Sequence, residues 1–151
     1  MNLRNYAFAA LTALALSIAP MAKAADKGCS NATLRGTFSD RDSGWIYAAP
    51  PPAAPIPFAG VNVDTFDGNG NVTFTGTGSV GGNVSAGSST GTYKVNPDCT
   101  GTYTATGGGM TIHASFVISD NGNQLDIVIT DPGTVILCVA RRQFPVGDWR
   151  Q

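Results

Sequence analysis

The sequence contains no glutamate, and all ten of its acidic residues are aspartate. Glutamate favours helices, whereas the abundant residues here, nineteen glycines and many threonines, favour turns and strands. This composition excludes an all-helical fold. Basic residues number only nine against the ten acidic ones, so a strongly basic nucleic-acid-binding surface is excluded as well.

The sequence has only one long apolar run, from Tyr6 to Ala19, which is shorter than the about 20 residues that span a bilayer. Arg4 precedes this run, and a small-x-small cleavage pattern, Ala22-Lys23-Ala24, follows it. These three parts in this order are typical of a signal peptide. We therefore expect residues 1–24 to be removed, with no membrane span remaining, and the protein to be exported to the periplasm or the medium.

Histidine and cysteine are scarce: His113 is the only histidine, and the three cysteines are far apart. With this spacing we do not expect a zinc site, and we predict neither a metal nor a cofactor. In an oxidising compartment a disulfide is expected. Three pairings are possible, of which we favour Cys29 with Cys99, because Cys138 lies inside an apolar strand and is expected to be a small buried core residue.

Turn-forming residues divide the rest of the chain at short, even intervals, as in Asp67-Gly68-Asn69-Gly70 and Gly107-Gly108-Gly109. The connections are too short for parallel crossovers, so strands that follow one another should pair antiparallel. We predict eight or nine strands, depending on whether the first two form one bent strand. They span residues 32–39, 44–48, 57–66, 71–80, 88–95, 100–106, 110–119, 124–130 and 134–142.

Apolar and polar residues alternate within these strands, for example from Met110 to Ile118, so each strand has one apolar face. A long antiparallel meander can bury such a face by closing into a barrel, which also removes unpaired edges. We predict an all-β domain over residues 25–143, a closed small barrel, followed by a tail over residues 144–151. A barrel of about eight strands is filled by side chains or holds one small ligand.

Two sets of residues carry a resemblance to known families. The first strand contains Gly36-Thr37-Phe38 and the last strand ends in Arg141-Arg142, which is similar to the calycin pattern of lipocalins. That resemblance implies an aromatic ring and an arginine stacked across the closed end of the barrel. Phe38 stands where lipocalins usually have tryptophan.

The turn sequences between Cys29 and Gln143, such as Asn96-Pro97-Asp98-Cys99 and Asp131-Pro132-Gly133, look like those of secreted bacterial proteins of unassigned function. These proteins are often grouped with the allene oxide cyclase barrel. The resemblance covers nearly the whole mature chain and implies a calycin-like barrel fold. The cyclase family has a glutamate within its cavity, and this chain has none to match it.

The last strand predicts which arginine closes the barrel. Val135, Leu137 and Val139 share one phase with Arg141, so we expect these residues to point inward and Arg141 to lie over Phe38. Arg142 would then face solvent. A cation–π contact of this kind contributes about 0.5 to 2 kcal/mol.

We expect the barrel to be a non-catalytic protein that binds a small apolar ligand, since apolar cavities with a few polar groups are the usual form of such sites. Alternatively, the aromatic residues simply fill the core. Asp64 is placed inside by one phase of its strand and outside by the other, which buries Val61 and Val63 instead. The candidate lining is Phe58, Asn62, Asp64, Phe66, Phe74, Tyr93, Tyr103 and Phe116.

The sequence offers no catalytic residues. His113 should point outward, away from any nucleophile, and Asp67–Asn71 matches only the first half of a calcium loop, so we interpret it as a hairpin turn. Two other functions stay open. One is a cyclase or isomerase that folds its substrate in an apolar cavity; the other is a structural or surface module with Pro50–Pro57 and the tail as contact points. The oligomeric state is not specified by these patterns.

Overall fold

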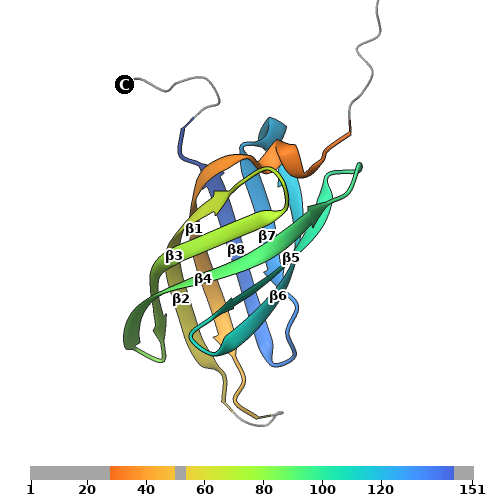
Figure 1. The fold of residues 1–151 in the computed structure, drawn as a ribbon. Coiled ribbons are helices and arrows are strands. Elements are labelled where there is room, and N and C mark those ends of the chain that lie inside the picture. The colour runs from red at the N-terminus through yellow and green to blue at the C-terminus, as the bar shows by residue number, and fades with distance from the viewer. Residues whose placement is uncertain (1–27, 50–53, 145–151) are drawn as a thin grey trace, which may run out of the picture.

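The chain folds into a closed barrel of eight antiparallel strands, shown in Figure 1. This computed structural model describes residues 28–49 and 54–144. The predicted signal peptide, most of the prolines of the 50–57 segment and all of the predicted tail except Phe144 lie outside the described residues. The all-β class, the antiparallel meander and the closure into a barrel are confirmed. Within the described residues, no helix is long and apolar enough to cross a membrane.

Each strand pairs with the next one along the chain, and the last pairs with the first. The first two predicted strands form one continuous strand, and the strand predicted to begin at residue 88 begins at Asn83. The strands are β1 (Gly36–Ile46), β2 (Ile56–Phe66), β3 (Asn71–Val80), β4 (Asn83–Val95), β5 (Thr100–Gly107), β6 (Met110–Ser119), β7 (Gln124–Ile129) and β8 (Thr134–Arg142).

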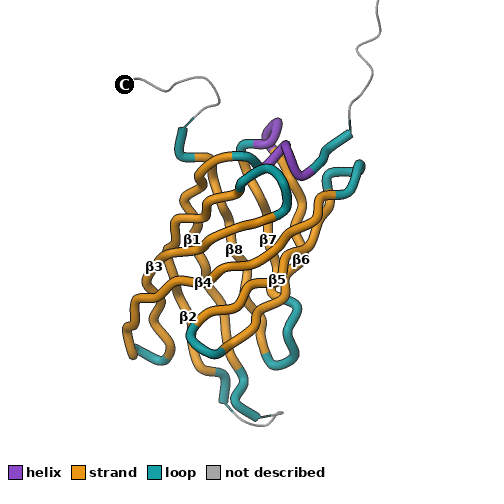
Figure 2. Tube along the Cα trace, viewed as in Figure 1, coloured by secondary structure: helices purple, strands orange, loops and turns teal. Residues whose placement is uncertain are grey.

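Two short 3-10 helices, η1 (Asn31–Leu34) and η2 (Asp120–Gly122), lie together at one end of the barrel, as Figure 2 shows. We call this the closed end. The turn between β2 and β3 also lies there, and Asp67 holds it: Asp67 Oδ1 accepts hydrogen bonds from the amides of Asn69, Gly70 and Asn71 at 2.7–3.0 Å. The hairpin-turn interpretation of this segment is therefore confirmed.

Aromatic side chains fill the closed end. The Phe66 ring makes edge contacts with Phe38, at 5.4 Å between ring centroids, and with Tyr93, at 5.1 Å. Leu34 of η1 is buried beside them. Edge-to-face pairs of this kind add about 0.5–1.5 kcal/mol to the burial of their apolar area, so this half of the barrel is a packed core.

Arg142, not Arg141, covers this core. The Arg142 guanidinium lies 4.5 Å from the centroid of the Phe38 ring. It also donates hydrogen bonds to the carbonyl oxygens of Arg35 at 2.6 Å, Thr33 at 3.0 Å and Gly122 at 2.9 Å. The predicted stacking on Phe38 is thus present, but the choice of Arg141 was wrong, because Arg141 is exposed on the outer face.

The predicted phase of β8, which placed Val135, Leu137 and Val139 inside with Arg141, was wrong as well. Ile136, Cys138 and Ala140 point inward with Arg142, whereas Leu137 on the other face is 64% exposed. Both faces of β8 are apolar between Val135 and Ala140, so alternation could not distinguish them. Pairing with β1 decides the phase, since Phe38 lies opposite Arg142 and Asp42 lies opposite Cys138.

The disulfide joins Cys29 to Cys99, as favoured from the sequence, and Cys138 is free and buried. The bond attaches the segment before η1 to the turn between β4 and β5. The Cys29 amide also donates to the Pro97 carbonyl oxygen at 3.1 Å. The chain entering the barrel is therefore held against the closed end at two points.

The opposite end, which we call the open end, is formed by the β1–β2, β3–β4, β5–β6 and β7–β8 connections. Here the β3–β4 hairpin extends past its neighbour and projects to the lower left in Figure 1. Residues Asn83–Gly87 pair with β3 only, because the ladder between β4 and β5 begins at Thr90. Every residue from 83 to 88 is exposed, so this stretch has no interior face.

Candidate ligand-binding site

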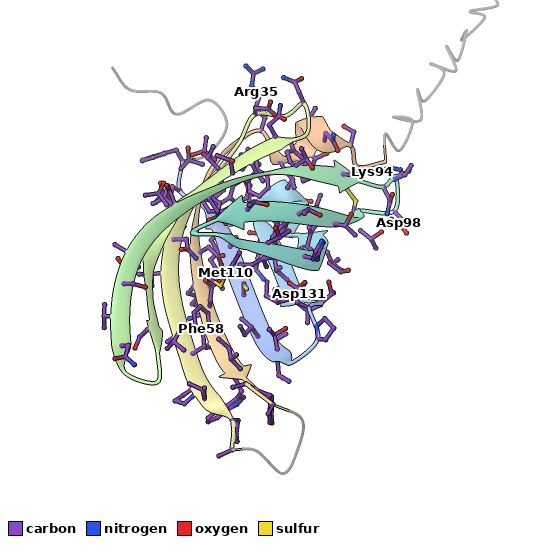
Figure 3. The ribbon with its side chains drawn as sticks, turned by 60° about the horizontal axis from the view of Figure 1, so that its bottom comes forward. Arg35, Phe58, Lys94, Asp98, Met110 and Asp131 are labelled. Atoms are coloured by element: carbon purple, nitrogen blue, oxygen red, sulfur yellow. A yellow bond between two sulfur atoms is a disulfide. The ribbon has the colours of Figure 1, made fainter. Side chains whose placement is uncertain are left out.

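The half of the barrel nearest the open end is hollow. It contains a cavity of about 560 Å³, which falls within the range of roughly 300–1,000 Å³ typical of small-molecule sites. Figure 3 looks toward this end, where Phe58, Met110 and Asp131 are labelled. The interior is therefore divided into a packed closed half and a hollow open half.

Aliphatic and aromatic side chains from seven strands form most of the cavity wall. The Phe58 ring lies over glycines, since a Cβ at Gly60 or Gly78 would be 3.4 Å from it. Phe74 of β3 and Tyr103 of β5, which are two strands apart in the sheet, contact each other with ring centroids 5.2 Å apart. The inward-facing Gly60 and Gly78 leave space that side chains would otherwise fill. The main apolar lining residues are Ile46, Phe58, Phe74, Ile112, Ile129 and Ile136.

The predicted lining residues divide between the two halves. Phe58, Asn62, Phe74 and Tyr103 line the cavity. The other aromatic residues pack in the closed half: Phe66 and Tyr93 contact each other, and the Phe116 ring lies directly on Gly101, where any Cβ would overlap it. Ligand contact by the first group stays a prediction.

Acidic side chains from β1 and β2 meet at the floor of the cavity, between the two halves. Asp40 and Asp42 are two residues apart and therefore share one face of β1. In the register with β2, Asp40 lies opposite Asn62. Asn62 Nδ2 donates a 2.7 Å hydrogen bond to Asp42 Oδ2. Asp64 lies next along the inner face of β2, on the side of the floor away from the cavity: it is 0% exposed and, contrary to the predicted lining, does not itself line the cavity.

This acidic floor, defined by Asp40, Asp42 and Asp64, has acceptors without donors. Asp40 Oδ1, Asp42 Oδ1 and both carboxyl oxygens of Asp64 are buried without a hydrogen-bond partner. Asp40 is only 6% exposed. Buried polar groups are almost always hydrogen-bonded, and buried charges are almost always paired. Such a cluster therefore requires bound protons or a bound cation.

Burial raises the pKa of both inner carboxyl groups. Desolvation, with the neighbouring charges of Asp42 and Asp64, raises the pKa of Asp40 to about 9. Desolvation and the charge of Asp42 raise the pKa of Asp64 to about 8. Burial also raises the pKa values of Tyr103 and Cys138, which face the same cluster from β5 and β8. Asp40 and Asp64 therefore hold protons at neutral pH when no ligand is bound.

These pKa values predict how stability changes with pH. An unfolded aspartate ionises near pH 4, whereas the folded chain keeps the Asp40 and Asp64 protons until about pH 8 to 9. The free energy of unfolding should therefore fall as the pH rises between these limits. We expect it to be lower at pH 8 than at pH 5 by at least about 2 kcal/mol, measured by urea denaturation.

The Asp64→Asn variant should show a smaller decrease over the same pH range, because its amide does not ionise. Asp126→Asn, at an exposed position on the outer face, is the matched control and should follow the wild-type curve. Equal slopes in all three proteins would contradict the assignment of raised pKa values to the floor.

The thiol of Cys138 lies beside the acidic floor. One carboxylate oxygen each from Asp40 and Asp42 and the Sγ of Cys138 lie within 4.8 Å of one another. Carboxylate and thiolate are donor types that divalent cations such as zinc accept. The sequence spacing did not indicate this group, because its members come from strands at opposite ends of the chain that become neighbours only when the barrel closes.

Two of the floor residues were missed by the sequence analysis and one was left open. Asp40 and Asp42 follow Phe38 at intervals of two residues, and this shared phase could have placed them inside. Of the two phases considered for Asp64, the inward one is present, since Asp64 is buried and Val61 is 63% exposed. Cys138 is buried as expected and also lines the cavity.

His113 is on the outer face, as predicted. Its Nδ1 lies 2.7 Å from Asp131 Oδ1, and its backbone amide donates to Asp131 Oδ2 at 2.8 Å. These contacts join β6 to the β7–β8 turn at the rim of the open end. His113 therefore positions the rim and does not reach the acidic floor.

No protein-family model matches the chain, and comparisons with curated proteins and with solved structures find no significant match.

Proposed function

We propose that this chain is an exported barrel protein that binds a small, largely apolar molecule in the cavity of its open half. The single observation that carries the proposal is the hollow of about 560 Å³ with mostly apolar walls. The packed closed half, with its disulfide and the Arg142 cap, supplies a core of its own. The open half can therefore remain hollow without loss of the fold.

Two observations support export. The Cys29–Cys99 disulfide is typical of oxidising compartments, and residues 1–24 carry the three parts of a signal peptide. Membership of the allene oxide cyclase barrel-like group is part of the same proposal and rests on the turn sequences together with the barrel. Amino-terminal sequencing of the secreted protein should begin at Ala25; an intact leader on the mature protein would contradict export by this signal.

Filling the cavity tests the binding function. Ala105 is 3% exposed and lines the cavity, so Ala105→Phe should occupy the space that the ligand needs. We expect the variant to bind the uncharged fluorescent probe N-phenyl-naphthylamine at least tenfold more weakly than wild type, a loss of about 1.4 kcal/mol. Fluorescence titration measures both affinities.

Ala59→Phe is the matched control. Ala59 is on β2 but faces outward and is exposed, so the same substitution there should leave probe binding unchanged. Thermal unfolding followed by circular dichroism checks that both variants fold. If wild type fails to bind the probe, or if Ala105→Phe binds it as wild type does, the cavity is not a ligand site.

A further inference from the structure

We infer that the ligand carries a protonated amine, which is seated on the acidic floor against Asp40 and Asp42 while its apolar body extends toward the open end. This inference rests on the proposed function and adds the chemical class of the ligand. The observation behind it is the pairing of two features in one space: an apolar wall and a floor of carboxyl groups that lack donors.

The protein supplies no cation to this floor within the residues that the structure describes. Every basic side chain there is exposed except Arg142. Arg142 is committed to the carbonyl oxygens of the closed end. The one ion pair among the described residues joins His113 to Asp131 at the rim. Arg41, although it lies between Asp40 and Asp42 in the sequence, faces the other side of β1 and is exposed.

The hydrogen-bonding geometry favours a donor-rich ligand head. Asp40 Oδ1 and Asp42 Oδ1 are both buried acceptors without partners, and both residues line the cavity. Asn62 already donates its amide to the other oxygen of Asp42, which fixes the carboxylate in place. An ammonium group carries three donors and no acceptor, and charge-assisted hydrogen bonds to carboxylates are about twice as strong as neutral ones.

Other head groups fit this floor less well. At neutral pH a carboxylate brings only acceptors to oxygens that already lack donors, and an alcohol brings only one donor. A divalent cation would satisfy Asp40, Asp42 and Cys138, but it would leave the apolar wall above them without an occupant. An amine with an apolar body accounts for the floor and the wall together.

A matched series of head groups tests this inference on the disulfide-bonded mature protein. Octylamine, octanol and octanoate share one apolar body and differ in charge. We expect calorimetry at neutral pH to show octylamine binding at least tenfold more tightly than octanol, and octanoate binding most weakly. Asp40→Asn and Asp42→Asn should each reduce the preference for the amine while octanol binding stays near its wild-type value, which also shows that the variants fold. Asp126→Asn is the exposed control.

The possible outcomes separate the inference from the proposed function. Equal affinity for the three amphiphiles overturns the inference, whereas binding of N-phenyl-naphthylamine still supports the cavity as a ligand site. Tightest binding of octanoate also overturns it. If Zn²⁺ raises the melting temperature, blocks octylamine binding and loses both effects in Cys138→Ser, the floor is a metal site and the inference fails. Loss of amine preference only in the floor variants supports it.

Discussion

Replacing Arg142 with alanine should reduce the free energy of unfolding by about 3 kcal/mol, and replacing Arg141 should change it by less than about 0.5 kcal/mol. The Arg142 change removes the contact with the Phe38 ring and the hydrogen bonds to three carbonyl oxygens. Those carbonyls then depend on water for their partners. Arg141 is exposed on the outer face of β8, so its loss removes little packing.

Thermal and urea unfolding of the two variants measure this difference. In a domain of this size, about 3 kcal/mol corresponds to a decrease in melting temperature of roughly 10 °C. Arg142→Lys gives a further comparison. Lysine keeps the positive charge but lacks the planar guanidinium that donates to three carbonyl oxygens. This variant should therefore recover only part of the free energy of unfolding that Arg142→Ala loses. Equal destabilisation by Arg141→Ala and Arg142→Ala would contradict the conclusion that Arg142 stabilises the closed end.

Removing the disulfide should have an effect of similar or larger size. Cys29 and Cys99 are 70 residues apart in the sequence, and closing a loop of that length stabilises a fold by about 4 kcal/mol in the chain-entropy model. The Cys29→Ser/Cys99→Ser double variant should therefore unfold at a clearly lower urea concentration than the oxidised wild type.

The reduced wild type provides the control for this experiment. In the presence of dithiothreitol it should unfold at the same urea concentration as the double serine variant, which should itself not respond to the reductant. A Cys138→Ala variant should keep the full response to reduction, because Cys138 is free. If the oxidised wild type and the double variant unfolded at the same urea concentration, the bond would not contribute to stability.

The positions of most strands could be predicted because turn-forming residues mark the ends of the strands in the sequence. Residues 71–80 and 110–119 were predicted as strands and are β3 and β6 with the same limits. Gly108 and Gly109 adopt positive φ angles, which few residues other than glycine adopt, so they mark a turn. Alternation then gave the inner face wherever the outer face was polar, as in β3.

Where both faces of a strand were apolar, or where the inner face was polar, the sequence was ambiguous. β8 is apolar on both sides, and only its register with β1 shows that Ile136 and Arg142 point inward. In β1 the inner face is acidic, so Asp40 and Asp42 interrupted the apolar pattern that marks a buried strand. Residues that break such a pattern are expected at functional sites, where local rules are often violated.

The cavity itself could not be predicted, because it depends on how side chains from strands far apart in sequence share one interior. Phe58, Phe66 and Phe74 look equivalent in the sequence. Phe66 has aromatic neighbours on both sides and is packed, whereas Phe58 lies over Gly60 and Gly78 and borders open space. Whether an aromatic residue fills a barrel or lines a hollow is decided by its neighbours across the sheet.

The projecting β3–β4 hairpin leaves one stretch of backbone, Asn83–Gly87, paired on one side only. An unpaired strand edge can template the addition of a strand from another molecule and so start an intermolecular sheet. This stretch is short and made of asparagine, serine, alanine and glycine around the exposed Val84, residues that mostly have low strand propensity and little apolar surface. Its composition gives an incoming strand little to pack on, which protects the barrel from polymerising through this edge.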